Sequence, residues 1–136
     1  MGFFGVSLDY AGFGNVIVEL LEKISGGNPF LLLISMIVLI SLTCLVGAHP
    51  MIPAVAIAGS VNPVEFGFSK ELFSLVLLSG WVLGSVVSPL STNNISAAGL
   101  LGIKTFDISF RWNMVYGMVS ILASVIILLV FRELGL

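Results

Sequence analysis

Charged residues are scarce in this chain of 136 residues. They make up 9% of the sequence, whereas a soluble domain carries about 25%. Hydrophobic residues account for 58%, and the mean hydropathy is +1.19. The net charge is −2, and the five Lys and Arg residues are scattered along the sequence. They form no basic patch or stripe of the kind that binds a nucleic acid backbone. The composition predicts an all-α, multi-pass protein of the cell's inner (plasma) membrane, with the lipid bilayer as a partner and no nucleic acid.

Cysteine and histidine are almost absent as well. Cys44 is the only cysteine and His49 the only histidine. One thiol cannot form an intrachain disulfide or a Cys-x-x-Cys metal site, and we expect Cys44 to be a small buried hydrophobe. The sequence also has no HExxH, GxSxG or Walker pattern. We therefore expect no enzyme, no catalytic residues and no resident metal or cofactor.

Residues 28–62 combine a long apolar run with an abrupt interruption. Pro29 to Gly47 is long enough to enter a bilayer deeply as a helix, and the sequence GAHPMIP then breaks the pattern. The returning arm, Met51 to Val61, is too short to span. Non-helical backbone is tolerated at membrane depth only where protein or a watery cavity receives its polar groups. These residues predict a re-entrant helical hairpin whose tip faces inward.

Residues 70–103 predict a discontinuous transmembrane helix. An apolar stretch ends at Val87, the polar sequence SPLSTNN follows at residues 88–94, and the helix resumes as ISAAGLLGI. Gly80 and Gly84 lie four residues apart in the first part, a spacing that permits close helix packing.

The ends of the chain carry simpler patterns. Residues 112–132 predict a final span after a polar link, and residues 1–27 predict a partial amphipathic helix. Because that helix begins as if in mid-fold, we expect residues 1–136 to be a single membrane domain that is part of a larger protein.

We expect the two interruptions to meet. A half-helix N-terminus attracts an anion and a half-helix C-terminus attracts a cation, and paired interruptions are typical of the midplane site of a secondary transporter. The predicted substrate-binding and ion-binding residues come from the two interrupted stretches: Gly47, Ala48, His49, Pro50, Ser88, Pro89, Ser91, Thr92, Asn93 and Asn94.

Two alternatives remain open at this point. The Ser, Thr and Asn side chains could serve only to cap the broken helix and satisfy its freed backbone groups. His49 could be a proton-coupling site or an anion ligand, or a structural histidine that donates to a carbonyl at the hairpin tip.

The order of these elements resembles the C-terminal repeat of the ion transporter superfamily. That superfamily includes the divalent anion/sodium symporters, the arsenite permeases and the large membrane subunit of the tripartite dicarboxylate transporters. The likeness lies in LVGAHPMIPAVAIAGS, then VVSPLSTNNISAAG, then IKTFDISFRWN and the last helix. Ala48-His49-Pro50 stands where the dicarboxylate/sodium branch has a Ser-Asn-Thr signature. The resemblance implies a substrate site between residues 47–50 and 88–94, and a second, inverted repeat that this chain does not contain.

We therefore expect the C-terminal portion, or one subunit, of an ion-coupled secondary active transporter for a small anion such as an organic acid. The coupling ion would be Na⁺ or H⁺. The partners would be the substrate and either the missing N-terminal repeat or a second copy of the chain. The alternative is a non-transporting membrane subunit of a larger complex, because the chain is short.

Overall fold

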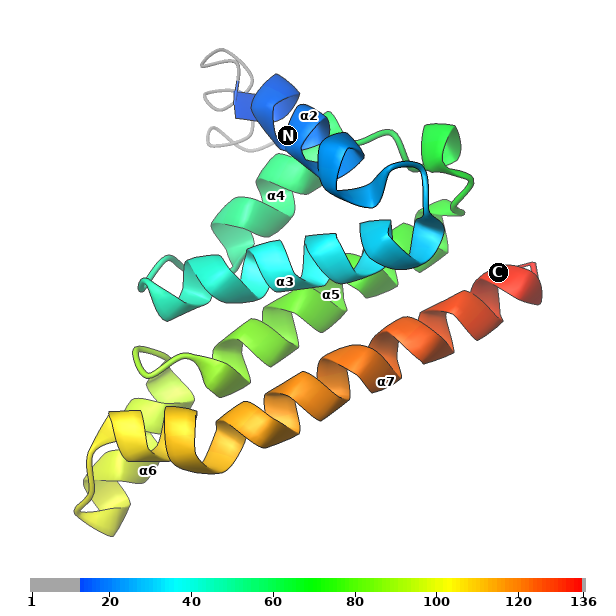
Figure 1. The fold of residues 1–136 in the computed structure, drawn as a ribbon. Helices are drawn as coiled ribbons and strands as arrows, with labels where there is room; N and C mark the ends of the chain where they lie inside the picture. The colour runs from blue at the N-terminus through cyan, green and yellow to red at the C-terminus, as the bar shows by residue number, and fades with distance from the viewer. Residues whose placement is uncertain (1–12, 136) are drawn as a thin grey trace.

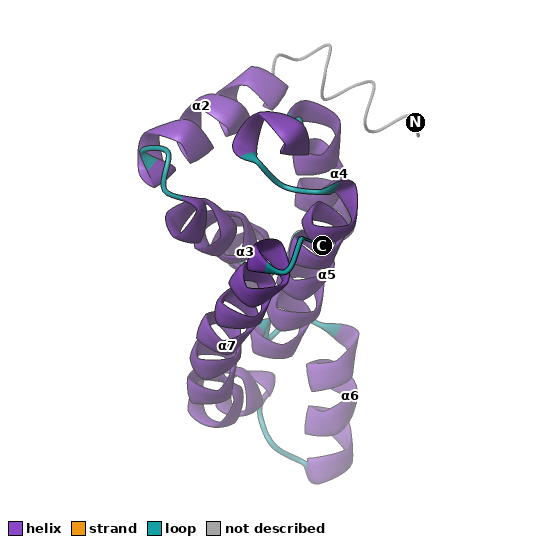
Figure 2. Ribbon diagram, turned by 90° about the vertical axis from the view of Figure 1, so that its right-hand side faces the viewer, coloured by secondary structure: helices purple, strands orange, loops and turns teal. Residues whose placement is uncertain are grey.

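The computed structural model describes residues 13–135, and this part of the chain is all-helical with no strand (Figure 2). The expected all-α class is confirmed for these residues, while residues 1–12 of the first predicted helix lie outside them. The elements in order are α2 (Phe13–Ser25), α3 (Pro29–Leu45), α4 (Met51–Ser60), the 3₁₀-helix η1 (Pro63–Phe66), α5 (Lys70–Val87), α6 (Thr92–Leu101), the π-helix η2 (Asp107–Asn113) and α7 (Met114–Glu133).

Short polar side chains begin three of these helices. The Asn28 side chain accepts hydrogen bonds from the first turn of α3, and Pro29 follows it at a position where a missing N–H costs nothing. Ser69 accepts from the Leu72 N–H at 3.0 Å at the start of α5. Ser91 does the same for α6, accepting from the Asn94 N–H at 3.3 Å. The helix starts are therefore encoded locally in the sequence.

Helices α3, α5 and α7 lie side by side, with α5 between the other two (Figure 1). Helix α2 packs across α3 and α4, and α4 runs back from the end of α3 toward α2. The fully buried side chains that join these helices are Leu21, Leu33, Met36, Ile37, Ile40, Ile57, Leu72 and Val76. The core therefore lies mainly among α2 to α5, and α7 contributes the buried side chains of Val125 and Leu128 to it.

Two glycines bring α5 close to α3. A Cβ atom at Gly80 would lie 2.8 Å from Ile40 Cδ1, and one at Gly84 would lie 2.7 Å from Cys44 Sγ. Cys44 is 3% exposed and packs as a small apolar residue at this contact. The face of α5 that bears both glycines is therefore covered by the chain's own helix and offers no surface to another protein.

Two helical segments are long and apolar enough to cross a membrane: α5 with α6, at Lys70–Leu101, and η2 with α7, at Asp107–Glu133. Helix α3 has 17 residues and α4 has 10, which correspond to about 26 Å and about 15 Å. Large apolar side chains such as Met118, Leu122 and Ile126 are exposed along α7. Runs of exposed apolar side chains of this kind mark a surface that contacts lipid or another protein.

The polar link expected before the last helix is itself largely helical. Residues 107–113 form the π-helix η2, which continues directly into α7. Its backbone pairs each N–H with the carbonyl five residues earlier, so its side chains follow a wider spiral than those of an α-helix. Ser109 and Asn113 of η2 both reach Asn94 on α6, and these contacts accompany the altered helical register.

Candidate functional site

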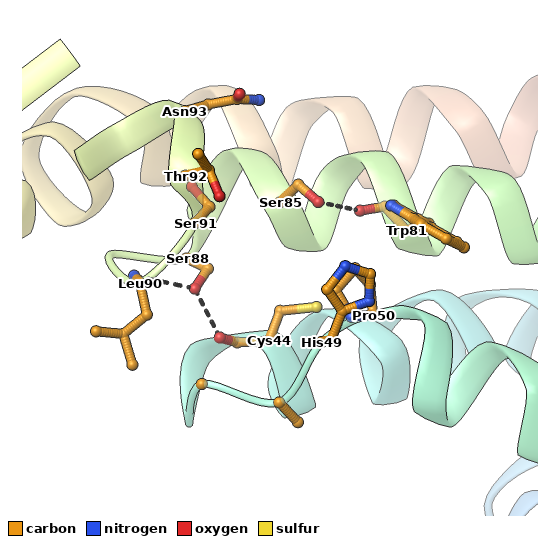
Figure 3. A pocket seen from close by; sticks show the side chains of 12 residues that line it. Cys44, His49, Pro50, Trp81, Ser85, Ser88, Leu90, Ser91, Thr92 and Asn93 are labelled. Atoms are coloured by element: carbon orange, nitrogen blue, oxygen red, sulfur yellow. Dashed lines mark hydrogen bonds between the residues drawn. The ribbon is translucent and has the colours of Figure 1, made fainter. Parts of the chain in front are cut away.

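A cavity of about 250 Å³ lies between the hairpin turn after α3 and the interruption between α5 and α6 (Figure 3). In Figure 3 the turn forms one wall, α5 forms the wall opposite, and the interruption closes one end. The lining residues are Cys44, Gly47, Ala48, His49, Pro50, Trp81, Ser85, Ser88, Leu90, Ser91, Thr92 and Asn93. The two interrupted stretches, which are far apart in the sequence, therefore meet in space.

Ser88 joins the two stretches directly. Its hydroxyl donates to the Cys44 carbonyl oxygen at 2.6 Å and accepts from the Leu90 N–H at 3.2 Å, and its side chain is buried. The Leu90 side chain reaches the turn, where a Cβ atom at Gly47 would lie 2.8 Å from Leu90 Cδ1. Gly47 also has a φ of 91°, a conformation that favours glycine. The close approach and the backbone conformation together account for glycine at this position.

Asn94 holds the interruption of the broken helix. Its Nδ2 lies 2.8 Å from the Val86 carbonyl oxygen, 2.8 Å from the Ser88 carbonyl oxygen and 3.0 Å from Ser109 Oγ. Asn113 adds a second amide, which donates to the Val86 oxygen at 3.1 Å and to Asn94 Oδ1 at 3.4 Å. These side chains replace the helical donors that the last turn of α5 loses at the interruption.

The structure separates the ten predicted residues into two groups. Eight of them line the cavity, whereas Asn94 is turned toward the interruption and Pro89 is buried within it. The Asn94 amide bonds to the carbonyl groups that are freed at the interruption. This is the capping and backbone-support role that was considered as the alternative to ligand binding. A binding role for the eight residues in the cavity wall stays a prediction.

Thr92 and Asn93 differ from the polar residues around them. Within residues 13–135, the Thr92 hydroxyl and the Asn93 amide make no hydrogen bond, and both side chains are exposed. Their backbone N–H groups belong to the first turn of α6, where no helical acceptor exists. Thr92 lies beside Ser91 in Figure 3, and Asn93 lies farther from the hairpin turn, at the edge of the cavity. The beginning of α6 therefore brings uncommitted donors to the cavity.

Two carbonyl groups at the interruptions are, in contrast, already occupied. Cys44 O accepts from the Gly47 N–H and from Ser88 Oγ, and Val86 O accepts from two side-chain amides. The first-turn N–H groups of α6 are donors only, whereas the Thr92 hydroxyl and the Asn93 amide can both donate and accept. A helix N-terminus of this kind suits an anion or a polarised oxygen.

His49 forms part of the turn side of the cavity. Its Nδ1 accepts a hydrogen bond from the Met51 N–H at 3.3 Å, and its ring meets the Trp81 ring edge-on at a centroid distance of 5.6 Å. The histidine thus accepts from a backbone N–H, rather than donating to a tip carbonyl as one expectation had it. A lone pair on Nδ1 places the hydrogen of the neutral ring on Nε2. Nε2 is therefore the ring nitrogen that His49 can offer to a ligand as a donor.

Sequence reasoning missed four lining residues: Cys44, Trp81, Ser85 and Leu90. Trp81, Ser85 and Ser88 are spaced by four and three residues along α5, which places them on one helix face. That spacing, counted backward from Ser88, is the signal that could have found two of them. Cys44 and Leu90 carry no polar pattern that distinguishes them from core residues.

Among residues 13–135, no Lys, Arg, Asp or Glu lines the cavity. Within the part of the chain that the structure describes, no group of three His, Cys, Asp or Glu side chains could hold a metal ion. The ionisable side chains in the described cavity wall are therefore His49 and Cys44.

No protein-family model, curated protein or solved structure matches the chain. Function is therefore inferred from the cavity and the helices that form it.

Proposed function

We propose that the chain is the C-terminal portion, or one subunit, of an ion-coupled secondary active transporter for a small anion, of the ion transporter superfamily type. It would lie in the inner (plasma) membrane as part of a multi-pass domain that is completed by an inverted N-terminal repeat or a second copy. The observation that carries the proposal is the meeting of two interrupted stretches around one cavity with free donors.

In this proposal α3 and α4 form a re-entrant hairpin. Both helices are shorter than the hydrocarbon core of a bilayer, which is about 30 Å thick. The turn between them contacts the interruption of the neighbouring helix through Ser88 and Leu90. A turn that ends against protein in this way can lie inside a membrane, because its polar groups need not face lipid.

The segment formed by α5 and α6 is the discontinuous transmembrane helix of the proposal. Its two halves are joined by residues 88–91, and the second half begins at the cavity. The N-terminal end of a helix carries about half a positive charge, which favours an anion close to Thr92 and Asn93. Transporters place substrates at such half-helix ends, where backbone groups replace water around the ligand.

Alternating access needs an interface that can shift, and the contact between the hairpin and the broken helix offers one. Among residues 13–135, one side-chain hydrogen bond, from Ser88 to Cys44, crosses from the broken helix to the α3 end. The internal network of the interruption, built on Asn94 and Asn113, does not involve the hairpin. In this proposal the turn and α4 move against the interruption while that network stays intact and α3 stays packed on α5 at Gly80 and Gly84.

The proposal is tested on the complete assembly, purified from its native membrane through a tag on this chain and reconstituted in liposomes. Initial uptake of isotopically labelled small organic and inorganic anions is measured with and without a Na⁺ or H⁺ gradient, because a monoanion that moves with one Na⁺ or H⁺ carries no net current. We expect at least one anion to show gradient-dependent uptake. Uptake that matches that of empty liposomes for every anion would refute transport and leave the non-transporting subunit as the function.

Variants of the free donors connect the uptake to this cavity. We expect Thr92→Ala and Asn93→Ala each to reduce the initial uptake by roughly tenfold, the effect of one lost hydrogen bond to a charged group. Ser74→Ala and Ser79→Ala are matched controls, because these hydroxyls donate to carbonyls of their own helix, to Lys70 O and Leu75 O. Full uptake in both Thr92 and Asn93 variants would remove them from the site.

A further inference from the structure

The charges of this chain lie away from the cavity between the hairpin turn and the broken helix. Its polar wall consists of hydroxyls, one amide, one imidazole and one indole. The cations occupy other places: Lys23 on α2, Lys70 at the start of α5, Lys104 after α6, Arg111 in η2 and Arg132 near the end of α7. Arg132 is held by the Gly67 carbonyl oxygen at 3.4 Å and by the Phe68 ring. Among residues 13–135, no Lys or Arg side chain lines the cavity.

This absence limits the charge that the ligand can bring. Moving an ion from water into protein is costly unless it is paired, and the cost rises with the square of the charge. The start of α6 supplies about half of a positive charge, and neutral donors supply hydrogen bonds. One carboxylate can be matched by these groups. Among the described residues of this chain, no Lys or Arg side chain in the cavity wall could pair with a second carboxylate.

His49 presents one edge of its ring to a ligand. Its Nδ1 accepts from the Met51 N–H at 3.3 Å, and the edge-on contact with Trp81 holds the ring at the cavity wall. The Nε2 atom is therefore the ring nitrogen that can donate a hydrogen bond to a carboxylate oxygen.

The size of the cavity sets a second limit. Its volume of about 250 Å³ lies below the range of about 300–1,000 Å³ that holds drug-sized ligands. An acid of a few carbon atoms fits this space.

We infer that the site accepts its substrate as a small monoanion, such as a short monocarboxylate, and discriminates against dianions of the same size. The inference rests on the proposed transport function and specifies its substrate class.

The test compares acids that share a carbon skeleton and differ in charge. Butyrate, monomethyl succinate and succinate are added at neutral pH to liposomes that contain the complete assembly, and initial uptake of each isotopically labelled acid is measured. Labelled uptake is needed because a current also depends on the charge of the substrate. We expect uptake of the two monoanions to exceed uptake of succinate by at least roughly tenfold, since the second charge is unpaired.

A variant with an added charge provides a gain-of-function arm. Ser85 lines the cavity, and its hydroxyl donates to the Trp81 carbonyl oxygen of its own helix, so its replacement removes no hydrogen bond between helices among the described residues. We expect Ser85→Lys to raise the ratio of succinate to monomethyl succinate uptake. Ser74→Lys, on the exposed face near the start of α5, is the matched control and should leave the ratio unchanged.

The possible outcomes distinguish failure of this inference from failure of the proposed transport function. Uptake of succinate that equals or exceeds uptake of monomethyl succinate overturns the inference while transport stands. Transport of a divalent inorganic anion such as sulfate, with no uptake of any monoanion, also overturns it. Absence of transport for every anion overturns the proposed function and the inference together.

Discussion

Replacing Asn94 by alanine removes the side chain that holds α5 and α6 together at their interruption. The amide is 5% exposed and lies within hydrogen-bond distance of Val86 O, Ser88 O and Ser109 Oγ. Two of these acceptors keep a partner in the variant. Val86 O retains the Asn113 amide at 3.1 Å, and Ser88 O retains the Ser91 N–H at 3.3 Å.

The expected loss of stability follows from these contacts. Nδ2 carries two hydrogens, so Asn94 donates two bonds at a time, each with a net value of about 1 kcal/mol. Ser109 Oγ is fully buried and loses the partner described here, which leaves a buried polar atom unsatisfied at a cost of about 1 kcal/mol or more. We expect Asn94→Ala to lower the free energy of unfolding by about 3 kcal/mol. Asn93→Ala, its exposed neighbour, should change it by less than about 0.5 kcal/mol.

Cys44 makes the measurement direct. It is the only thiol in the chain and is buried beside the interruption, so a maleimide dye reacts when α3 and α5 separate. The free energy of unfolding is obtained from denaturant titration in detergent, and the labelling rate is measured under native conditions. A loss of about 3 kcal/mol corresponds to labelling faster by up to roughly a hundredfold. Equal stability of the Asn94 and Asn93 variants would show that the amide contacts do not hold the interruption.

Two further predictions concern packing and topology. Gly84→Ala should destabilise the fold by about 1–3 kcal/mol, because its Cβ would lie 2.7 Å from Cys44 Sγ, and Gly99→Ala, with nothing within 4 Å, should stabilise α6 by about 0.5–1 kcal/mol. Denaturant titration of both variants checks the pair, and a stable Gly84 variant would contradict the close contact of α3 and α5. If α3 and α4 are re-entrant, cysteines introduced as Lys23→Cys and Glu65→Cys in a Cys44→Ser background will react with an impermeant maleimide from the same side of oriented vesicles. Reaction from opposite sides would mean that the hairpin region crosses the membrane.

Much of the secondary structure could be predicted, because the chain marks its helix ends with residues of strong local preference. Pro29 follows the cap of α3, Gly47 and Pro50 interrupt the hairpin, and Pro89 interrupts the long apolar segment. Each acts through its own backbone geometry and needs no partner. The π-helix at residues 107–113 could not be anticipated in this way. Its polar residues favour a loop by local preference. Its π-helical conformation accompanies hydrogen bonds of Ser109 and Asn113 with Asn94, which are tertiary contacts.

The candidate site was located in outline from the sequence, because polar residues inside apolar helices are costly unless something satisfies them. The sequence does not show what satisfies each one. Ser85 and Trp81 were overlooked because they lie in an uninterrupted helix, and their access to the cavity depends on how α5 packs against the hairpin turn. Tertiary contacts likewise decide that the Ser88 hydroxyl is hydrogen-bonded and that the Thr92 hydroxyl is not.

Asn93 and Asn94 are neighbours in the sequence but have different surroundings in the structure, so each must be considered separately. Successive side chains on a helix point about 100° apart, so neighbouring positions at the start of α6 face different surroundings. Asn94 faces the freed carbonyls of α5, while Asn93 lies at the edge of the cavity. A loss of transport in an Asn94 variant would therefore follow from a weakened interruption without any contact to substrate. A loss of transport in an Asn93 variant of unchanged stability would assign its amide to the ligand, because no internal hydrogen bond in the described residues depends on it.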